Sequence, residues 1–319
     1  METMNRKCLY CYDTLNELEG DFHSSCSLDF FGTKQPPEFS YSLAQMDELA
    51  KDVVERSIAV PGVQPKLSLT MVISGALEDG KSGRLTVVGA LGGNYIFKPP
   101  LTLFPEMPQN EHVTMRLAEA YGIRTAKSSL IRLKSGELSY ITKRFDRKDQ
   151  GEKIHMLDMY QVLEAFDKYK GSMEKVGKGI GQYSSRALFD KLTYFELTIF
   201  SYLTGNNDMH LKNFSLLARE GNWALSPAYD LLNVAIVNPE DKEELALTLD
   251  GKKRKLRLEH FQGLGNGLDL NSKQIRRVFE KFKSFQLEAQ GWVGKSFLSQ
   301  EYQQKYIELL KERYTTLFS

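Results

Sequence analysis

The sequence predicts an α+β protein with two lobes, in which a β-rich N-terminal lobe precedes a mainly helical C-terminal lobe. Short runs rich in β-forming residues lie between residues 66 and 145. Apolar residues at helical spacing dominate from about residue 155 onward. The length of 319 residues is typical of two domains or of two lobes. We therefore expect a small Cys/His-rich segment at 1–35, an N-terminal lobe at 36–148 and a C-terminal lobe at 149–319.

The elements of the N-terminal lobe follow from local patterns. Apolar residues at helical spacing predict a helix at 42–57. The segment NEHVTMRLAEAYG predicts a second helix, which ends at Gly122. A hairpin is expected around the turn KSGE at 134–137. The expected antiparallel strands are KLSLTMVI (66–73), RLTVVGAL (84–91), NYIFK (94–98), KSSLIRL (127–133) and LSYITKRF (138–145).

Helical patterns dominate the C-terminal lobe. The apolar segment 185–203 predicts a buried helix. A strand is expected at FSLL (214–217), and a hairpin at 243–261 around Asp250 and Gly251. The remaining expected helices are MLDMYQVLEAF (156–166), NSKQIRRVFEKFKSF (271–285) and QEYQQKYIELLKERYTTLF (300–318).

Composition excludes several classes of protein. The formal net charge is +1, which argues against nucleic acid as a direct partner. No apolar run reaches the roughly 18 residues needed to cross a bilayer, and the N-terminus lacks the apolar core of a signal peptide. We therefore expect a cytoplasmic protein without a membrane partner.

Four polar residues recur in an order that suggests chemistry. Lys98 ends the strand NYIFK, and Asp208 and Asn213 form a D-x-x-x-x-N pattern in TGNNDMHLKNFSLL. Asp230 follows in LSPAYDLLN. This is the order of parts in protein-kinase-like enzymes, in which a lysine holds nucleotide phosphates, one Asp receives the acceptor's proton, and Asn and Asp bind Mg²⁺. Taken singly, each residue is more often a cap, a turn residue or a solvated charge.

The segments around these residues resemble the HipA family of toxin–antitoxin serine/threonine kinases, over roughly residues 56–310. NDMHLKNFS is close to the catalytic loop D-x-H-x-K-N-F-S of that family. The resemblance implies a bilobal protein-kinase-like fold, ATP and Mg²⁺ as cofactors, and phosphorylation of a host protein, often an aminoacyl-tRNA synthetase. It also implies an antitoxin partner of the helix-turn-helix type, which is HipB-like. The segments are PGVQPKLSL (61–69), YIFKPP (95–100), PQNEHVTMRLAEAYGI (108–123), ITKRFDRK (141–148), HMLDMYQVL (155–163), TGNNDMHLKNFSLL (204–217) and LSPAYDLLN (225–233).

The resemblance also implies roles for individual residues. Asp208 is the expected catalytic base, supported by His210 and Lys212, and Asn213 and Asp230 are the expected Mg²⁺ ligands. The expected nucleotide-binding residues are Lys98, the phosphate loop with Gly62, Val63, Gln64 and Lys66, the hinge residues Lys143, Arg144 and Phe145, and the weaker candidates Gln161 and Tyr229.

Three further positions have expected roles outside this set, and one of them leaves two alternatives open. Glu111 either pairs with Lys98, as a helix glutamate does in kinases, or only favours the dipole of the first turn of its helix. Asn206 and Asn207 are expected to shape the turn before Asp208.

The chain departs from better-known members of the family in two respects. Only about 55 residues precede the phosphate loop, which resembles a short branch of the family whose missing part is supplied by a small separate HipA N-terminal-like protein. The regulatory serine of the family is expected near Ala59, with Ser57 two residues away, so autoinhibition by phosphorylation is not expected from this sequence.

The cysteines suggest a metal site. Cys8, Cys11, His23 and Cys26 give the spacing C-x2-C-x11-H-x2-C, and four such ligands suit a tetrahedral, structural Zn²⁺ in a segment with few core residues. The alternative is that the cysteines are small buried apolar residues.

Two other functions stay open at this point. One is a catalytically degenerate nucleotide-binding module within an antitoxin or repressor complex, and the other is a zinc-dependent nucleic-acid binder built on residues 8–26. Labelling of a host protein from ATP separates the first of these from a kinase.

Overall fold

The computed structural model describes residues 6–46, 48–49, 66–72, 83–88, 92–148 and 151–318. The chain forms two compact units. Unit 1 contains residues 1–112 and 126–152, and unit 2 contains residues 113–125 and 153–319. Helix α3 (Met107–Tyr121) therefore begins in unit 1 and continues in unit 2.

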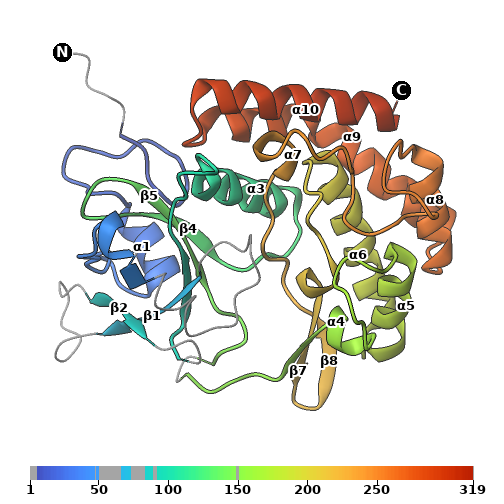
Figure 1. Ribbon diagram of the computed structural model, residues 1–319, viewed down its shortest axis with the longest axis horizontal. Helices are drawn as coiled ribbons and strands as arrows, with labels where there is room; N and C mark the ends of the chain where they lie inside the picture. Colours follow the sequence, from blue (N-terminus) through green and yellow to red (C-terminus); the bar gives the residue numbers. More distant parts are fainter. Residues whose placement is uncertain are drawn as a thin grey trace. The chain divides into compact units, whose positions relative to one another are not determined.

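Unit 1 is built on a five-stranded antiparallel sheet with the order β2-β1-β3-β5-β4 (Figure 1). Buried and half-buried residues alternate along β1, because successive side chains point to opposite faces of a sheet. The predicted antiparallel sheet and the hairpin of its last two strands are confirmed. The strands are β1 (Leu67–Val72), β2 (Arg84–Val88), β3 (Tyr95–Lys98), β4 (Ser128–Arg132) and β5 (Leu138–Lys143).

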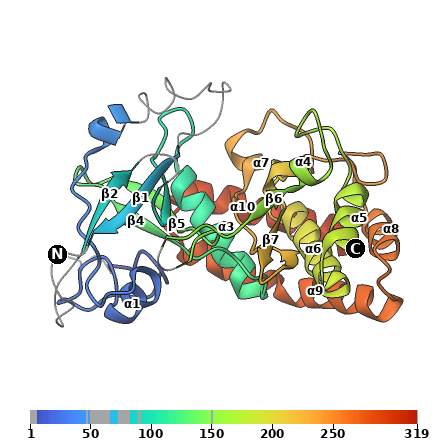
Figure 2. The same cartoon turned by 90° about the horizontal axis from the view of Figure 1, so that it is seen from below.

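The N-terminal segment packs against this sheet (Figure 2). It contains helix α1 (Ser24–Phe31), which the sequence analysis missed. The Leu9 carbonyl accepts a hydrogen bond of 3.2 Å from the backbone N–H of Leu130 on β4, and the ring of Phe30 lies 5.8 Å from that of Tyr95 on β3. Phe22, Phe30 and Phe31 are buried, so the expectation of a segment with few core residues was wrong.

Helix α3 begins earlier than predicted, at Met107, and ends at Gly122 as predicted. Gly122 has a φ of +100°, a conformation that glycine adopts without steric cost. The earlier start places Glu111 in the second turn of the helix. A first-turn role for Glu111 at the helix dipole is therefore excluded.

Unit 2 consists of a three-stranded antiparallel sheet, β6-β7-β8, and a set of helices of which α9 and α10 run alongside each other (Figure 1). No helix among the residues that the structure describes is long and apolar enough to span a bilayer. The elements are β6 (Met156–Asp158), α4 (Met159–Val162), α5 (Met173–Tyr183), α6 (Ala187–Leu203), the 3₁₀ helix η1 (Leu211–Asn213), β7 (Ser215–Arg219), β8 (Asn222–Leu225), α7 (Val234–Val237), α8 (Leu258–Gly267), α9 (Ser272–Lys295) and α10 (Gln300–Phe318).

Two predicted elements of unit 2 were wrong. The helix expected at 156–166 is a strand, β6, followed by a single helical turn, because the Asp158 side chain caps α4 and Met156 pairs with Leu217. The hairpin expected at 243–261 forms no strands, but its turn is present, with φ of 49° at Asp250 and 72° at Gly251, and the Glu244 N–H donates to the Lys253 carbonyl at 2.7 Å.

Side-chain and tertiary contacts replace the strand pairing that was expected between the two arms. The Glu244 side chain accepts a hydrogen bond of 2.8 Å from the backbone N–H of Leu256 and an ion pair of 2.9 Å from Arg313 of α10. Leu245 and Leu247 are fully buried, and the second arm continues into α8 at Leu258.

Candidate functional site

A buried ion pair joins β3 to α3 in unit 1. The Lys98 ammonium donates to both carboxylate oxygens of Glu111, at 2.6 and 2.8 Å. The two side chains are 5% and 3% exposed. Tyr140, opposite Lys98 on β5, places its ring centroid 5.4 Å from the ammonium. Burial of two charges costs free energy unless they pair with good geometry. Lys98 is therefore not a solvated lysine at the end of a strand but one member of a buried, bidentate ion pair. Of the two alternatives for Glu111, the pair with Lys98 is confirmed.

The end of α6 positions the loop that carries Asp208 in unit 2. Gly205, with a φ of +68°, donates to the Tyr202 carbonyl at 3.2 Å, and the N–H of Asn206 donates to the Ser201 carbonyl at 2.8 Å. These two bonds form a Schellman motif, which ends the helix and turns the chain. A Cβ on Gly205 would lie 2.4 Å from a methyl group of Leu309. Only glycine therefore fits at this turn.

Asn213, in η1, forms two hydrogen bonds that fix the loop of Asp208. Its side-chain amide donates to the backbone carbonyl of Asp208 at 3.1 Å, and its own N–H donates to the His210 carbonyl at 2.9 Å. The first of these bonds occupies the amide nitrogen of the Asn213 side chain. Its side-chain oxygen remains as the atom that suits a metal ion. Asp208 is half-buried and Asn213 is buried.

Asp208 has a partner that sequence reasoning missed. The Tyr169 hydroxyl donates to the Asp208 carboxylate at 2.9 Å, and the Tyr169 ring meets that of His210 edge-on at 5.0 Å. Burial, followed by the charge of Asp208, raises the pKa of Tyr169, so its hydroxyl stays a donor. No motif signals this tyrosine, because it lies in an irregular segment far along the chain from Asp208.

His210 and Lys212 differ in environment. His210 is buried, and burial lowers its pKa, which favours the neutral ring. Lys212 is exposed, and its ammonium lies 4.8 Å from the centroid of the Tyr160 ring. A neutral histidine therefore packs under the loop, and a lysine projects outward from it.

The neighbouring turn carries Tyr229 and Asp230. Asp230 has a φ of +60°, a conformation that costs a non-glycine residue about 1–3 kcal/mol and occurs often at functional sites. The Tyr229 hydroxyl donates to the Lys212 carbonyl at 2.7 Å and is hydrogen-bonded to the Ser215 hydroxyl at 2.6 Å. Tyr229 thus ties the turn of Asp230 to the loop of Asp208.

The other expected nucleotide-binding residues belong to both units. Gln161 accepts a bond of 3.1 Å from the N–H of Asp158 in a capping box, so its side-chain oxygen is occupied. Lys143 ends β5, and Arg144 forms a bidentate ion pair with Asp146. Lys66 is exposed just before β1, whereas Gly62, Val63 and Gln64 lie outside the described residues. Ser57 and Ala59 also lie outside them.

Asn206 and Asn207 both lie buried in the turn before Asp208. The Asn207 amide donates to the Asp241 carboxylate at 3.2 Å and to the Glu243 carbonyl at 3.0 Å, so it links the turn to another loop of unit 2. This is consistent with the expected structural role.

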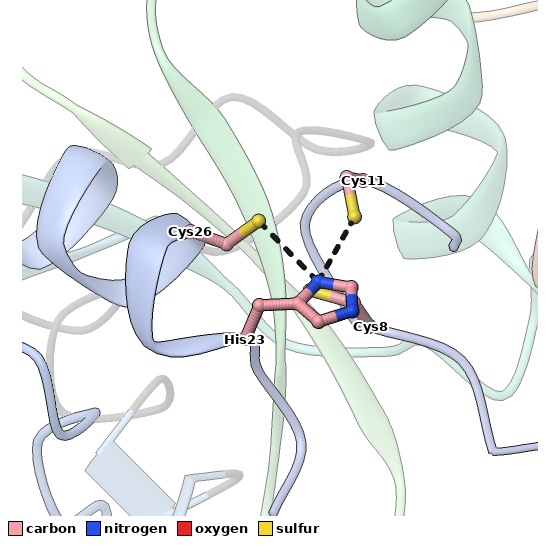
Figure 3. A group of neighbouring side chains, drawn as sticks. All are labelled: Cys8, Cys11, His23 and Cys26. Atoms are coloured by element: carbon pink, nitrogen blue, oxygen red, sulfur yellow. Dashed lines mark hydrogen bonds between the residues drawn. The ribbon is translucent and has the colours of Figure 1, made fainter. Parts of the chain in front are cut away.

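The four expected zinc ligands converge at the edge of unit 1 (Figure 3). Their ligand atoms all lie within 4.8 Å of one another. The Nδ1 atom of His23 lies 3.4 Å from the Cys11 sulfur and 3.6 Å from the Cys26 sulfur. Around a tetrahedral Zn²⁺ with bonds of about 2.0–2.3 Å, ligand atoms lie about 3.5–3.8 Å apart. The residues therefore fit zinc in both chemistry and spacing.

Two contacts, one with a neighbouring residue and one within the cluster, favour the binding of a cation. The other ring nitrogen of His23, Nε2, lies 3.1 Å from the Thr14 carbonyl, and an N–H there leaves Nδ1 free of its proton. The Cys11 thiol lowers the pKa of Cys8 to about 5, which favours a thiolate. Both arrangements are typical of metal ligands.

Comparison with known proteins gives several matches. Relatives from Sinorhizobium fredii and Haemophilus influenzae, each named "Putative kinase", are 30% and 29% identical over 79% and 62% of this chain. The serine/threonine-protein kinase toxin HipA of Shewanella oneidensis is 26% identical over 60% of this chain. This chain covers 64%, 59% and 47% of the length of these three proteins.

Two solved structures share the fold. One is the complex of HipA, HipB and operator DNA from Shewanella oneidensis, with a TM-score of 0.66 and 21% identity over 81% of this chain and 65% of the other. The second is the Helicobacter pylori proinflammatory kinase CtkA, with a TM-score of 0.51 and 14% identity over 70% of this chain and 87% of the other. The predicted kinase-like α+β fold is confirmed by these likenesses. Residues 58–289 match the HipA-like C-terminal domain, and the chain belongs to that family.

Proposed function

We propose that this protein is an ATP- and Mg²⁺-dependent protein serine/threonine kinase and the toxin of a toxin–antitoxin pair. The observation that carries the proposal is the buried bidentate pair of Lys98 and Glu111. A lysine fixed on a strand by a helix glutamate is the device with which kinases hold nucleotide phosphates. A buried ion pair is seldom needed for stability alone, because hydrophobic residues of similar volume often stabilise a fold equally well.

Each residue of the site has a role in this proposal. Lys98 neutralises the phosphates of ATP, and Asp208 accepts the hydrogen bond of the acceptor hydroxyl and orients it towards the γ-phosphorus. The oxygens of Asn213 and Asp230 hold Mg²⁺, which when bound neutralises charge on the phosphates. The γ-phosphoryl group passes from the β-phosphate oxygen to the acceptor oxygen, and the hydroxyl proton leaves through Asp208.

The substrate test uses host lysate. The protein is incubated with γ-labelled ATP, Mg²⁺ and lysate, in parallel with Asp208→Asn, and labelled bands are hydrolysed to identify the phosphorylated amino acid. We expect a band that requires Asp208 and contains phosphoserine or phosphothreonine. The control is Asp250→Asn, the same substitution at an exposed turn residue outside the proposed chemistry. Absence of any Asp208-dependent label would favour a degenerate nucleotide-binding module.

The proposed partner is a HipB-like antitoxin. The family membership and the HipA–HipB–operator structure of the Shewanella oneidensis relative support it. We expect expression of this chain to arrest growth, an antitoxin gene product from the same host to relieve the arrest, and Asp208→Asn to cause no arrest. A target among the aminoacyl-tRNA synthetases and a small HipA N-terminal-like partner protein belong to the same proposal. Growth arrest by Asp208→Asn equal to that of the wild type would contradict it.

The Cys/His cluster is proposed to hold a structural Zn²⁺, since all four ligands come from the protein. We expect one zinc ion per chain by elemental analysis of protein purified without chelator, and its loss in His23→Asn. His155→Asn is the matched control, because His155 lies outside the cluster and stacks edge-on with Trp223. Zinc-free wild-type protein would contradict the assignment.

A further inference from the structure

A residue next to the Cys/His cluster contacts the helix that carries Glu111. Tyr12 directly follows Cys11, and its hydroxyl is hydrogen-bonded to Nδ1 of His112 on α3 at 2.8 Å. The two rings also meet edge-on, with centroids 5.2 Å apart and planes at 89°. His112 is the next residue after Glu111. A direct chain of contacts within unit 1 therefore runs from Cys11 through Tyr12 and α3 to Lys98.

Every member of this chain from Tyr12 onward is buried. Tyr12 is 3% exposed, His112 is fully buried, and Glu111 and Lys98 are 2% and 4% exposed. Hydrogen bonds are electrostatically stronger in such an environment than in water, and packed side chains transmit small displacements. Because Tyr12, His112 and Glu111 are all buried, a displacement of Tyr12 moves the packed residues next to it, up to Glu111.

The metal ligands fix Tyr12 in a strained conformation. Tyr12 has a φ of +72°, and its N–H donates to the Cys8 carbonyl at 3.0 Å, which closes the turn between the two cysteines. A tyrosine with this φ costs about 1–3 kcal/mol and persists only where its surroundings hold it. The cysteines on one side and His112 on the other hold it here.

We propose that Tyr12 is a positioning residue, through which the zinc-bound segment holds α3 in the orientation that the Lys98–Glu111 pair requires. The inference rests on the proposed kinase function of that pair. Zinc then affects phosphoryl transfer indirectly: it fixes the position of α3 through His112 and Glu111 and takes no part in the chemistry. We call this support of α3 the brace. Loss of zinc, or oxidation of its thiolates to a disulfide by an oxidant that accepts two electrons, releases the turn and with it the brace.

The first test is a double-mutant cycle on phosphoryl transfer. Tyr12→Phe removes one hydrogen bond and keeps the ring, and we expect it to lower kcat about threefold to tenfold with zinc content unchanged. In a Glu111→Gln background, we expect Tyr12→Phe to have no additional effect, since a residue that acts through Glu111 is not additive with it. Tyr10→Phe is the matched control, because the Tyr10 hydroxyl donates to Asp29 of α1 at 2.6 Å. Full additivity of Tyr12→Phe and Glu111→Gln would overturn the inference.

The second test does not depend on kinase activity. Hydrogen exchange is measured for the backbone amides of residues 110–112 of α3 in zinc-loaded wild type, Tyr12→Phe and Tyr10→Phe, and in Cys26→Ser. We expect faster exchange in Tyr12→Phe and Cys26→Ser and wild-type exchange in Tyr10→Phe. Unchanged exchange in a folded Tyr12→Phe variant would overturn the inference even if the protein is an active kinase. Faster exchange without any phosphoryl transfer would leave the brace in place and contradict only the proposed function.

Discussion

Asp208 accepts a hydrogen bond from Tyr169 at the carboxylate that, in the proposed mechanism, receives the acceptor hydroxyl. A carboxylate has about four acceptor positions, so the tyrosine can orient Asp208 while leaving room for a substrate. The edge-on contact of Tyr169 with His210 fixes the ring of the tyrosine in turn. Two residues of irregular backbone thus determine where Asp208 points.

Tyr169→Phe tests this orientation. Loss of one hydrogen bond to a charged group should lower kcat by about tenfold to a hundredfold, because such bonds contribute roughly 1.5–3 kcal/mol, and should leave the KM for ATP unchanged. Steady-state kinetics measure both constants. The control is Tyr183→Phe at the end of α5, whose side chain is 47% exposed. Equal kcat values for the two variants would argue against a role for Tyr169.

Asp146 predicts a specific dependence of stability on pH. Burial alone would raise its pKa, but the hydrogen bonds from Arg144 and the charges of Arg144 and Arg147 lower the pKa below its ordinary value. A group with a lowered folded-state pKa stabilises the fold fully above its ordinary value of about 3.9, and that contribution is lost as pH falls through the folded-state pKa.

The difference in unfolding free energy between wild type and Asp146→Asn should therefore be constant from about pH 8 to pH 5 and shrink below about pH 4. Urea unfolding at several pH values measures it. A difference that grows as the pH falls would have the wrong sign for this ion pair.

At the scale of elements, most long regular segments could be predicted from the sequence and those shaped by tertiary contacts could not. Helix α6 is apolar enough to be recognised alone. Helix α5 was missed because it contains Gly177, Gly179 and Gly181, which weaken a helical pattern. Packing explains the first of them, since a Cβ on Gly177 would lie 2.3 Å from a methyl group of Leu268.

The residues of the candidate site also fall into two groups, those that the sequence indicated and those that depend on tertiary contacts. The motif residues of the site follow one another in the chain, so their order with Lys98 and Asp230, together with the family resemblance, pointed to Asp208 and Asn213. The choice for Glu111 stayed open because it depends on where α3 begins and on which side of the helix faces Lys98. Tyr169 and Tyr12 meet their partners 39 and 100 residues away along the chain, and a pairing of that kind leaves no local signal.

The turn at Gly205 is the element on which the loop of Asp208 depends. Gly205→Ala should lower the unfolding free energy by about 2–4 kcal/mol, from the positive φ and from the clash with Leu309. Gly221→Ala is the matched control, since Gly221 has a φ of +78° and no atom lies within 4 Å of an added Cβ, so only about 1 kcal/mol is expected there. Urea unfolding compares them, and equal losses would contradict the packing at Gly205.

At the scale of the whole molecule, the proposed chemistry is distributed over both units. Unit 1 contains Lys98, Glu111 and the zinc ligands, and unit 2 contains Asp208, Asn213 and Asp230. A change confined to unit 1 can therefore alter phosphoryl transfer while the proposed metal ligands and base of unit 2 stay intact. The zinc-bound segment is such a part of unit 1.

Removal of zinc should destabilise unit 1. The metal closes a loop from Cys8 to Cys26, which by analogy with a covalent cross-link contributes about 3 kcal/mol. Chelator-treated protein should therefore show a first melting transition roughly 5–10 °C below that of the zinc-loaded protein. Differential scanning calorimetry measures the shift, and chelator saturated with zinc is the control. Identical melting curves would mean that the cluster holds no structural metal.

The central claim is that Asp208 directs an acceptor hydroxyl to an ATP molecule bound by the other residues of the site. Single-turnover transfer of the γ-phosphoryl group to protein is the most direct test, measured for wild type and Asp208→Asn with Mg²⁺-ATP binding determined in parallel. The account predicts similar binding of Mg²⁺-ATP by the two proteins and a transfer rate at least about a hundredfold lower in the variant, as for loss of a general base. Equal transfer rates, or a wild type that binds Mg²⁺-ATP and transfers nothing to any protein of the host, would contradict it.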